Sequence, residues 1–218
     1  MLLPASEPDP AEALRGLLEK HRWLAIVRDV ETQRARESVG ALIEARVPLI
    51  EVTLTTPAAL EIVAESRASA AQAGVTLGVG SVLSADAARG SVGAGAQFLV
   101  TPHTEPAIVS AVQGQAGVLL GALTPTEIVL AAASGAAAVK LFPAAVGGPD
   151  YLRAVLAALR GVAVVPTGGV TASNAGAFLE SGAIAVAVGA WLTQDPDLVS
   201  QRAAEMYDAL SARRPEPR

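Results

Sequence analysis

The feature that most constrains this sequence is an alternation that runs along nearly its whole length. Short apolar runs rich in Val, Ile and Leu recur between segments whose apolar residues have helical spacing. Such runs, bounded by Gly, Pro, Thr or Ser, are typical of strands buried in a parallel sheet. The expected strands are residues 23–28, 48–54, 75–80, 97–100, 117–123, 137–142, 162–167 and 183–189.

The segments between these runs are expected to be helices. Several of them open with Thr-Pro, Ser or Thr, which are favoured in the first turn of a helix. Between the strands the expected helices are residues 32–45, 57–73, 84–94, 105–114, 125–134, 149–160 and 171–182. Two more helices are expected, at about 10–20 before the first strand and at about 195–211 after the last.

Eight strand–helix units in a chain of 218 residues, with no linker between them, predict an α/β protein with one (β/α)₈ TIM barrel domain over residues 1–218. An open doubly wound sheet is the alternative. It would normally use fewer strands and would carry a glycine-rich nucleotide loop, and neither GxGxxG nor a Walker-type motif occurs in the right context. The tail at about 212–218 is polar and contains proline, so we expect it to fray.

Composition excludes several classes of function. A net charge of −5 argues against nucleic acid or an anionic membrane as the main partner. The chain has no cysteine, and two histidines (His21 and His103) are too few for an ordinary histidine-rich metal site, so we expect no metal. The start MLLPASEPDP does not read as a signal peptide, and no uninterrupted apolar stretch reaches transmembrane length. A cytoplasmic location is therefore expected.

In a (β/α)₈ barrel the functional residues lie where strands end and loops begin. Three charged residues occupy such positions: Arg28 ends the first run, Glu51 lies in the second and Lys140 lies in the sixth. Residues two apart on a strand share a face, so Thr53 and Thr55 lie on the face of Glu51, and Phe142 lies on that of Lys140. The three charges are therefore expected to point into one barrel mouth.

Lys140 is one of only two lysines among sixteen basic residues. A lone lysine is most often a structural ion pair or lies with its head in water. Arginine would serve an ion pair equally well, but only lysine can lose its proton near neutral pH and attack a carbonyl. Desolvation among Val139, Leu141 and Phe142 would lower the pKa of Lys140. On the residues alone, a structural role and a Schiff-base role both stay open.

Glu51 also has two interpretations. A carboxylate within PLIEVTL is costly to bury unless it is paired, so it is either in a salt bridge with Arg28 or Lys140 or it is a general acid/base. Schiff-base chemistry needs such an acid/base, because water must leave the carbinolamine.

The PTGGV segment at residues 166–170 is a candidate anion site. Its two glycines follow a strand and precede a helix, where backbone N–H groups face an anion beside a positive helix end. The alternative is a tight turn that needs glycine only for its geometry. Because barrels often bind phosphate with the loops after strands 7 and 8, the position favours an anion site.

Seven motifs in order carry a resemblance to a known family. They are EVTLTTP (51–57), GVGSVL (78–83), FLVTPH (98–103), LTPTE (123–127), KLFPA (140–144), PTGGV (166–170) and VGAWL (188–192). In this order they resemble the 2-keto-3-deoxy-6-phosphogluconate (KDPG)/4-hydroxy-2-oxoglutarate (KHG) aldolase family, over about residues 23–192. The resemblance implies a class I aldolase on a (β/α)₈ barrel, usually a homotrimer, with no metal or organic cofactor, and a place in the Entner–Doudoroff pathway.

The resemblance also implies roles for individual residues. Lys140 is expected to form the Schiff base and Glu51 to act as the acid/base. Arg28 is expected near the substrate carboxylate. The remaining substrate-binding residues are expected to be Ser81, Pro102 and Phe142 at the pyruvyl end and Thr167, Gly168, Gly169, Gly189 and Ala190 at the phosphate end.

Three departures from the family pattern put the identity of the substrate in doubt. Thr55 occupies a position where some relatives have arginine, and Ala190 one where many have serine. The segment Thr101-Pro102-His103 corresponds to the sequence SPG in many relatives. The resemblance favours cleavage of KDPG to pyruvate and glyceraldehyde 3-phosphate. Its alternatives are the 6-phosphogalactonate epimer (KDPGal) and KHG. A phosphate-binding isomerase or synthase and a non-catalytic sugar-phosphate-binding barrel are alternatives of other classes.

Overall fold

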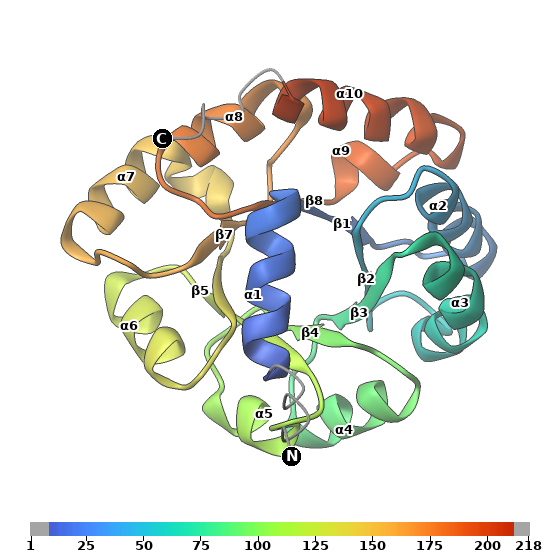
Figure 1. Ribbon diagram of the computed structural model, residues 1–218, viewed down its shortest axis with the longest axis horizontal. Helices are drawn as coiled ribbons and strands as arrows, with labels where there is room; N and C mark the ends of the chain where they lie inside the picture. The colour runs from blue at the N-terminus through green and yellow to red at the C-terminus, as the bar shows by residue number, and fades with distance from the viewer. Residues whose placement is uncertain (1–8, 212–218) are drawn as a thin grey trace, which may run out of the picture.

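The computed structural model describes residues 9–211 and shows a (β/α)₈ barrel (Figure 1). Its eight parallel strands all lie within the predicted runs, so the predicted fold is confirmed. They are β1 (Trp23–Val27), β2 (Leu49–Thr53), β3 (Thr76–Gly80), β4 (Phe98–Val100), β5 (Gly117–Ala122), β6 (Ala138–Leu141), β7 (Val164–Pro166) and β8 (Val186–Val188). The predicted frayed tail at 212–218 lies outside the described residues.

The long helices follow the prediction closely. They are α1 (Pro10–His21), α2 (Thr32–Glu44), α3 (Ala59–Ala73), α4 (Ala85–Gly93), α5 (Pro106–Ala111), α6 (Pro125–Ala133), α7 (Gly148–Ala158), α8 (Ala172–Glu180) and α10 (Val199–Ser211). Two short elements were not predicted, the 3₁₀ turn η1 (Ala144–Val146) and the helix α9 (Ala190–Thr193). The first part of the helix predicted at about 195–211 is the 3₁₀ turn η2 (Pro196–Leu198). Within residues 9–211 no helix is long and apolar enough to span a bilayer.

The strands pair in chain order, and β8 returns to β1, so the sheet curls into a nearly closed ring. The last junction is the weakest, because only a single bridge between Thr167 and Ala187 joins β7 to β8. This seam places the loops after β7 and β8 next to each other at the carboxyl end of the barrel.

The strands divide the apolar core in two. Alternate residues such as Val139 and Leu141 pack between the barrel and its outer helices. The others, including Leu24, Phe98 and Leu119, fill the barrel interior together with Leu14 and Leu18 of α1. As Figure 1 shows, α1 crosses the centre of the ring, and Arg15 Nε donates to the carbonyl of Ala137 just before β6. The amino end of the barrel is thus filled by apolar side chains, and the interior polar residues lie toward the opposite end.

Candidate active site

Lys140 projects from β6 into the barrel interior and is only 3% exposed. Its Nζ lies 5.0 Å from the centroid of the Phe142 ring. One expectation was wrong: Val139 and Leu141 do not surround the ammonium, because successive side chains on a strand point to opposite faces. Of the three residues expected around Lys140, Phe142 alone lies beside its ammonium.

This environment lowers the pKa of Lys140 below its usual value of 10.5, chiefly because burial disfavours the charged amine. The negative charge of Glu51 opposes the shift, and the positive charge of Arg28 adds to it. A larger fraction of Lys140 is therefore the neutral nucleophile near neutral pH than for a lysine in water.

Glu51 projects from β2 and is fully buried. Neither carboxylate oxygen has a hydrogen-bond partner, and none of the ion pairs among residues 9–211 includes Glu51. Burial raises the pKa of Glu51, while the charges of Lys140 and Arg28 act in the opposite direction. The salt-bridge interpretation of Glu51 is therefore not supported, and a carboxyl group with a raised pKa suits a general acid/base.

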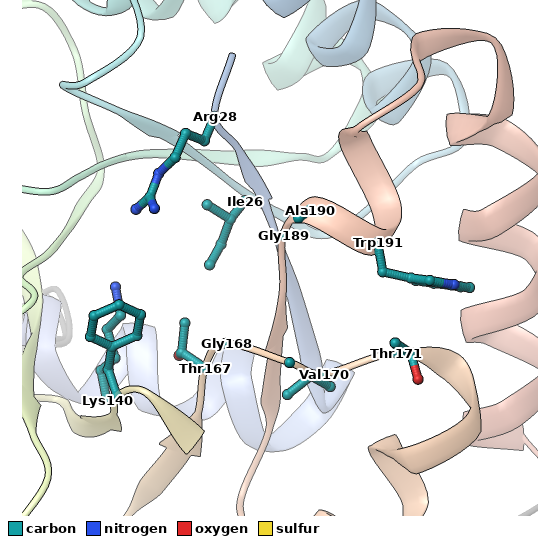
Figure 2. A pocket seen from close by; sticks show the side chains of 12 residues that line it. Ile26, Arg28, Lys140, Thr167, Gly168, Val170, Thr171, Gly189, Ala190 and Trp191 are labelled. Carbon is teal, nitrogen blue, oxygen red and sulfur yellow. The ribbon is translucent and has the colours of Figure 1, made fainter. Parts of the chain in front are cut away.

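Arg28 follows β1, and its guanidinium is turned toward Lys140 across the cavity (Figure 2). Its Nη2 donates to Ser81 Oγ at 3.5 Å, so the structure brings the ends of β1 and β3 together. Ser81 has φ of +58°, a left-handed conformation that is uncommon for residues other than glycine.

A cavity of about 250 Å³ opens at the carboxyl end of the barrel above β1, β6, β7 and β8 (Figure 2). Of residues 9–211, Arg28 and Lys140 contribute cationic side chains to it, and none with an acidic side chain lines it. The lining residues are Ile26, Arg28, Lys140, Phe142, Thr167, Gly168, Gly169, Val170, Thr171, Gly189, Ala190 and Trp191. Such a cavity suits an anionic ligand with a carbonyl beside the amine.

The structure gathers most, but not all, of the predicted site residues around this cavity. Glu51, Ser81 and Pro102 are not among its lining residues. Pro102 lies over β5, where a β-carbon on Gly121 would overlap the backbone of Pro102 and His103.

The sequence interpretation missed Ile26, Val170, Thr171 and Trp191. Ile26 shares the strand face of Arg28, and Val170 and Trp191 belong to the PTGGV and VGAWL motifs, so a signal existed for these three.

The loop after β7 is held in a left-handed conformation, with φ of +92° at Gly168 and +79° at Gly169. The carbonyl of Gly168 accepts from Ala145 N at 3.1 Å, and that of Gly169 accepts from Asn174 Nδ2 at 2.8 Å. Among the described residues no hydrogen bond engages the N–H groups of these two glycines. The glycines are thus needed for the turn, and the same turn leaves two donors beside the cavity.

The family model described as KDPG and KHG aldolase matches residues 15–208 of this chain. The chain belongs to this family. It is 35% identical over 153 residues to the probable 2-dehydro-3-deoxy-6-phosphogalactonate aldolase of Rhizobium meliloti (strain 1021), covering 69% of this chain and 72% of the relative. It is 32% identical over 177 residues to the 2-dehydro-3-deoxy-phosphogluconate aldolase of Treponema pallidum (strain Nichols), covering 80% and 83%.

Solved structures of the same family share the fold. A structure described as native KDPGal superposes with a TM-score of 0.80 at 27% identity, covering 97% of this chain and 98% of the other. The KDPG aldolase of Zymomonas mobilis ATCC 29191 superposes with a TM-score of 0.75 at 26% identity, covering 88% of this chain and 94% of the other. The protein is therefore an aldolase, a lyase of carbon–carbon bonds, and its relatives carry the names of both the gluconate and the galactonate enzymes. Family membership disfavours the isomerase, synthase and non-catalytic alternatives.

Proposed function

We propose that this aldolase cleaves KDPG reversibly to pyruvate and glyceraldehyde 3-phosphate through a Schiff base on Lys140. The observation that carries the proposal is the cavity itself. It is lined by a buried amine of lowered pKa, by the guanidinium of Arg28 and by the N–H groups of Gly168 and Gly169, which no other described residue engages. A 2-keto acid with a phosphate at its far end has a carboxylate, a ketone and a phosphate that these three groups can bind.

In the proposed mechanism the neutral Lys140 Nζ attacks the C2 ketone and forms a carbinolamine, which loses water to give a protonated imine. The imine accepts the electron pair of the C3–C4 bond as that bond breaks, while the C4 hydroxyl loses its proton. Glyceraldehyde 3-phosphate leaves, and the remaining enamine is protonated at C3. Water then hydrolyses the imine, which releases pyruvate and restores the amine.

Glu51 is proposed to move these protons, in part through water. Its raised pKa lets it keep a proton at a higher pH than an ordinary glutamate does, as a general acid requires. Within residues 9–211 its carboxylate oxygens have no hydrogen-bond partner, so they can bond a water or a substrate hydroxyl.

Arg28 is proposed to bind the substrate carboxylate, and the N–H groups of Gly168 and Gly169 to bind the phosphate. Both assignments rest on the position of these groups around the cavity. The other proposed substrate contacts are Ser81, Pro102 and Phe142 at the pyruvyl end and Thr167, Gly189 and Ala190 at the phosphate end.

KDPGal and KHG are the second candidate substrates. The relatives named phosphogalactonate aldolases favour the first, and the lack of a hydroxyl at Ala190 favours the second. Pyruvate release measured over a panel of the three purified compounds separates them, because the highest kcat/KM identifies the preferred substrate.

Covalent trapping tests the mechanism directly. Borohydride added with pyruvate should inactivate the enzyme irreversibly and label Lys140, with Lys20 as the internal control, since it is the only other lysine. Lys140→Arg should abolish turnover in a folded barrel, because charge and bulk remain but the nucleophile does not. Labelling of Lys20 alone, or full activity without labelling, would overturn the proposal.

A homotrimer is proposed on the family resemblance. In support, Val129 and Leu130 of α6 are each 50% exposed, which leaves an apolar helix surface that another copy can cover. Light scattering on the purified protein measures the oligomeric mass. The cytoplasmic location and the Entner–Doudoroff pathway stay predictions.

A further inference from the structure

Asp29 follows Arg28 directly and lies at the centre of a set of contacts between loops. Its N–H donates to Thr56 Oγ1 at 3.2 Å, which ties the β1–α2 loop to the end of β2. Its Oδ1 accepts from Glu31 N at 2.9 Å, and its Oδ2 accepts from Arg34 Nε at 3.2 Å. The Asp29 side chain is only 10% exposed, so its orientation is well defined.

Arg34 extends these contacts to the segment after β8, the strand next to β1. While Nε binds Asp29, Nη2 donates to the carbonyl of Gln194 at 2.8 Å. Gln194 is the residue after α9, and its own N–H donates to the carbonyl of Ala190 at 2.9 Å. One guanidinium thus joins the loop that carries Arg28 to the short helix that begins at Ala190.

The two joined loops hold opposite ends of the proposed ligand. Arg28 itself is weakly held, because within residues 9–211 its guanidinium makes one hydrogen bond, at 3.5 Å, to Ser81. Its position therefore depends on the backbone at Asp29. Ala190 and Trp191, which follow the adjoining strand β8, line the same cavity as the glycines after β7.

We propose that Asp29 and Arg34 are positioning residues that fix the separation between the carboxylate end and the phosphate end of the substrate cavity. This inference rests on the proposed function for the identity of the two ends. It assigns a role to residues that do not themselves line the cavity, and the role depends on the two separate arms of the Arg34 side chain.

An exposed ion pair by itself contributes little to stability, and Arg34 is 41% exposed. Asp29 differs from a surface carboxylate. Burial alone would raise the pKa of Asp29, yet the N–H of Glu31 and the guanidinium of Arg34 hold the pKa of Asp29 below its usual value. The half-buried Asp29 thus depends on Arg34 for its ionised form, although Arg34 itself remains partly in water.

The chain offers a matched control on the same helix. Arg36 of α2 pairs with Glu65 of α3 at 3.0 and 3.2 Å and is 37% exposed, but it contacts neither loop of the cavity. Arg34→Leu and Arg36→Leu each remove from α2 an arginine that makes two hydrogen bonds and one ion pair with a carboxylate. If the pair of Arg34 with Asp29 only stabilises the fold, both variants should have the same effect on kcat and KM.

The experiment measures kcat and KM for Arg34→Leu, Arg34→Lys and Arg36→Leu with KDPG and with the unphosphorylated KHG. Arg34→Leu should raise KM for both by roughly tenfold and leave kcat within about threefold, since small displacements of binding groups weaken binding strongly. Arg34→Lys keeps a cation for Asp29 but has no second arm for Gln194. It should raise KM for KDPG alone, and Arg36→Leu should change neither KM.

Two kinetic results would overturn the proposal: KM values for Arg34→Leu that match those of Arg36→Leu, or a fall in kcat with KM unchanged. If wild type cleaves neither compound, the proposed function fails separately, and hydrogen exchange still tests the coupling. Arg34→Leu should speed exchange in residues 28–31 and 190–194 together, and Arg36→Leu should not. Unchanged exchange in either segment contradicts the proposed link.

Discussion

The carboxylate of Glu51 occupies the space that a side chain at Gly80 would fill. A β-carbon built on Gly80 would overlap Oε1, Cδ and Cγ of Glu51. The two residues come from neighbouring strands, in which Thr53 of β2 is paired with Gly80 of β3. Because neither carboxylate oxygen has a hydrogen-bond partner, the shape of the adjoining strand helps to define where this acid lies.

Gly80→Ala is therefore expected to displace Glu51 and lower kcat by about 10²-fold, as misplacement by about 1 Å can do. Crowding this buried site should also cost about 1–3 kcal/mol of unfolding free energy. Gly90→Ala in α4 is the control, because no atom lies within 4 Å of the place that a β-carbon on Gly90 would take and the helix should tolerate it. Normal turnover in folded Gly80→Ala would show that Glu51 does not need its present position.

Glu51→Gln keeps size and hydrogen bonding but removes proton transfer, so kcat should fall by about 10²–10⁴-fold. Steady-state kinetics measures this, and an unchanged kcat would return Glu51 to a structural role.

Stability gives an independent check on Glu51. Burial raises the pKa of Glu51 above 4.5, so the folded state retains a proton that the unfolded state loses as the pH rises past that value. The wild-type unfolding free energy should therefore fall through this window, while Glu51→Gln lacks this contribution. Denaturant unfolding at several pH values should show the variant gaining stability relative to wild type as the pH rises; a constant difference would contradict the raised pKa.

The pH dependence of trapping reports on Lys140. At saturating pyruvate, the rate of borohydride inactivation should reach half its maximum below pH 10.5, because burial lowers the pKa of this amine. Arg28→Gln should move the midpoint up, since the charge of Arg28 disfavours the ammonium, and Glu51→Gln should move it down. Midpoints that shift together in one direction would show that these two charges do not act on Lys140 as described.

Ala190→Ser should strengthen binding of a phosphorylated substrate. Ala190 lines the cavity near Gly168 and Gly169, and a hydroxyl there would donate to an anionic oxygen. Hydrogen bonds to charged groups contribute roughly 1.5–3 kcal/mol, so KM for KDPG should fall by about tenfold or somewhat more. The value of kcat and the KM for KHG should change little. An equal fall in KM for KDPG and KHG would mean that the position does not face the phosphate. An unchanged KM for both would favour KHG as the natural substrate.

Chelation tests the expected independence from metal. Among residues 9–211 no three His, Asp or Glu side chains are grouped so that they could hold an ion. Exhaustive treatment with a chelator should leave turnover unchanged. Activity that is lost and then restored by a divalent ion would assign the chemistry to a metal and remove Lys140 from its central role.

The barrel could be predicted because buried parallel strands are apolar along their whole length, and the runs that contain Glu51 and Lys140 stand out for their charges. The surroundings of Lys140 were assigned wrongly because neighbours along a strand, such as Val139, point away from it. The contact between Arg34 and Gln194 joins residues 160 positions apart, so no local pattern indicates it. The helix α9 was missed because its four residues are too few to show a helical period.

The placement of α1 has a consequence for the order of the reaction. Because Leu14 and Leu18 help to fill the amino end of the barrel, the cavity beside Lys140 opens toward the strands' carboxyl ends. If the phosphate lies at the outer loops, the aldehyde product must depart before the pyruvate held on the lysine can follow. Pyruvate would then be the last product to leave and the first substrate to bind in the synthetic direction, and it would compete with the keto acid for the same amine.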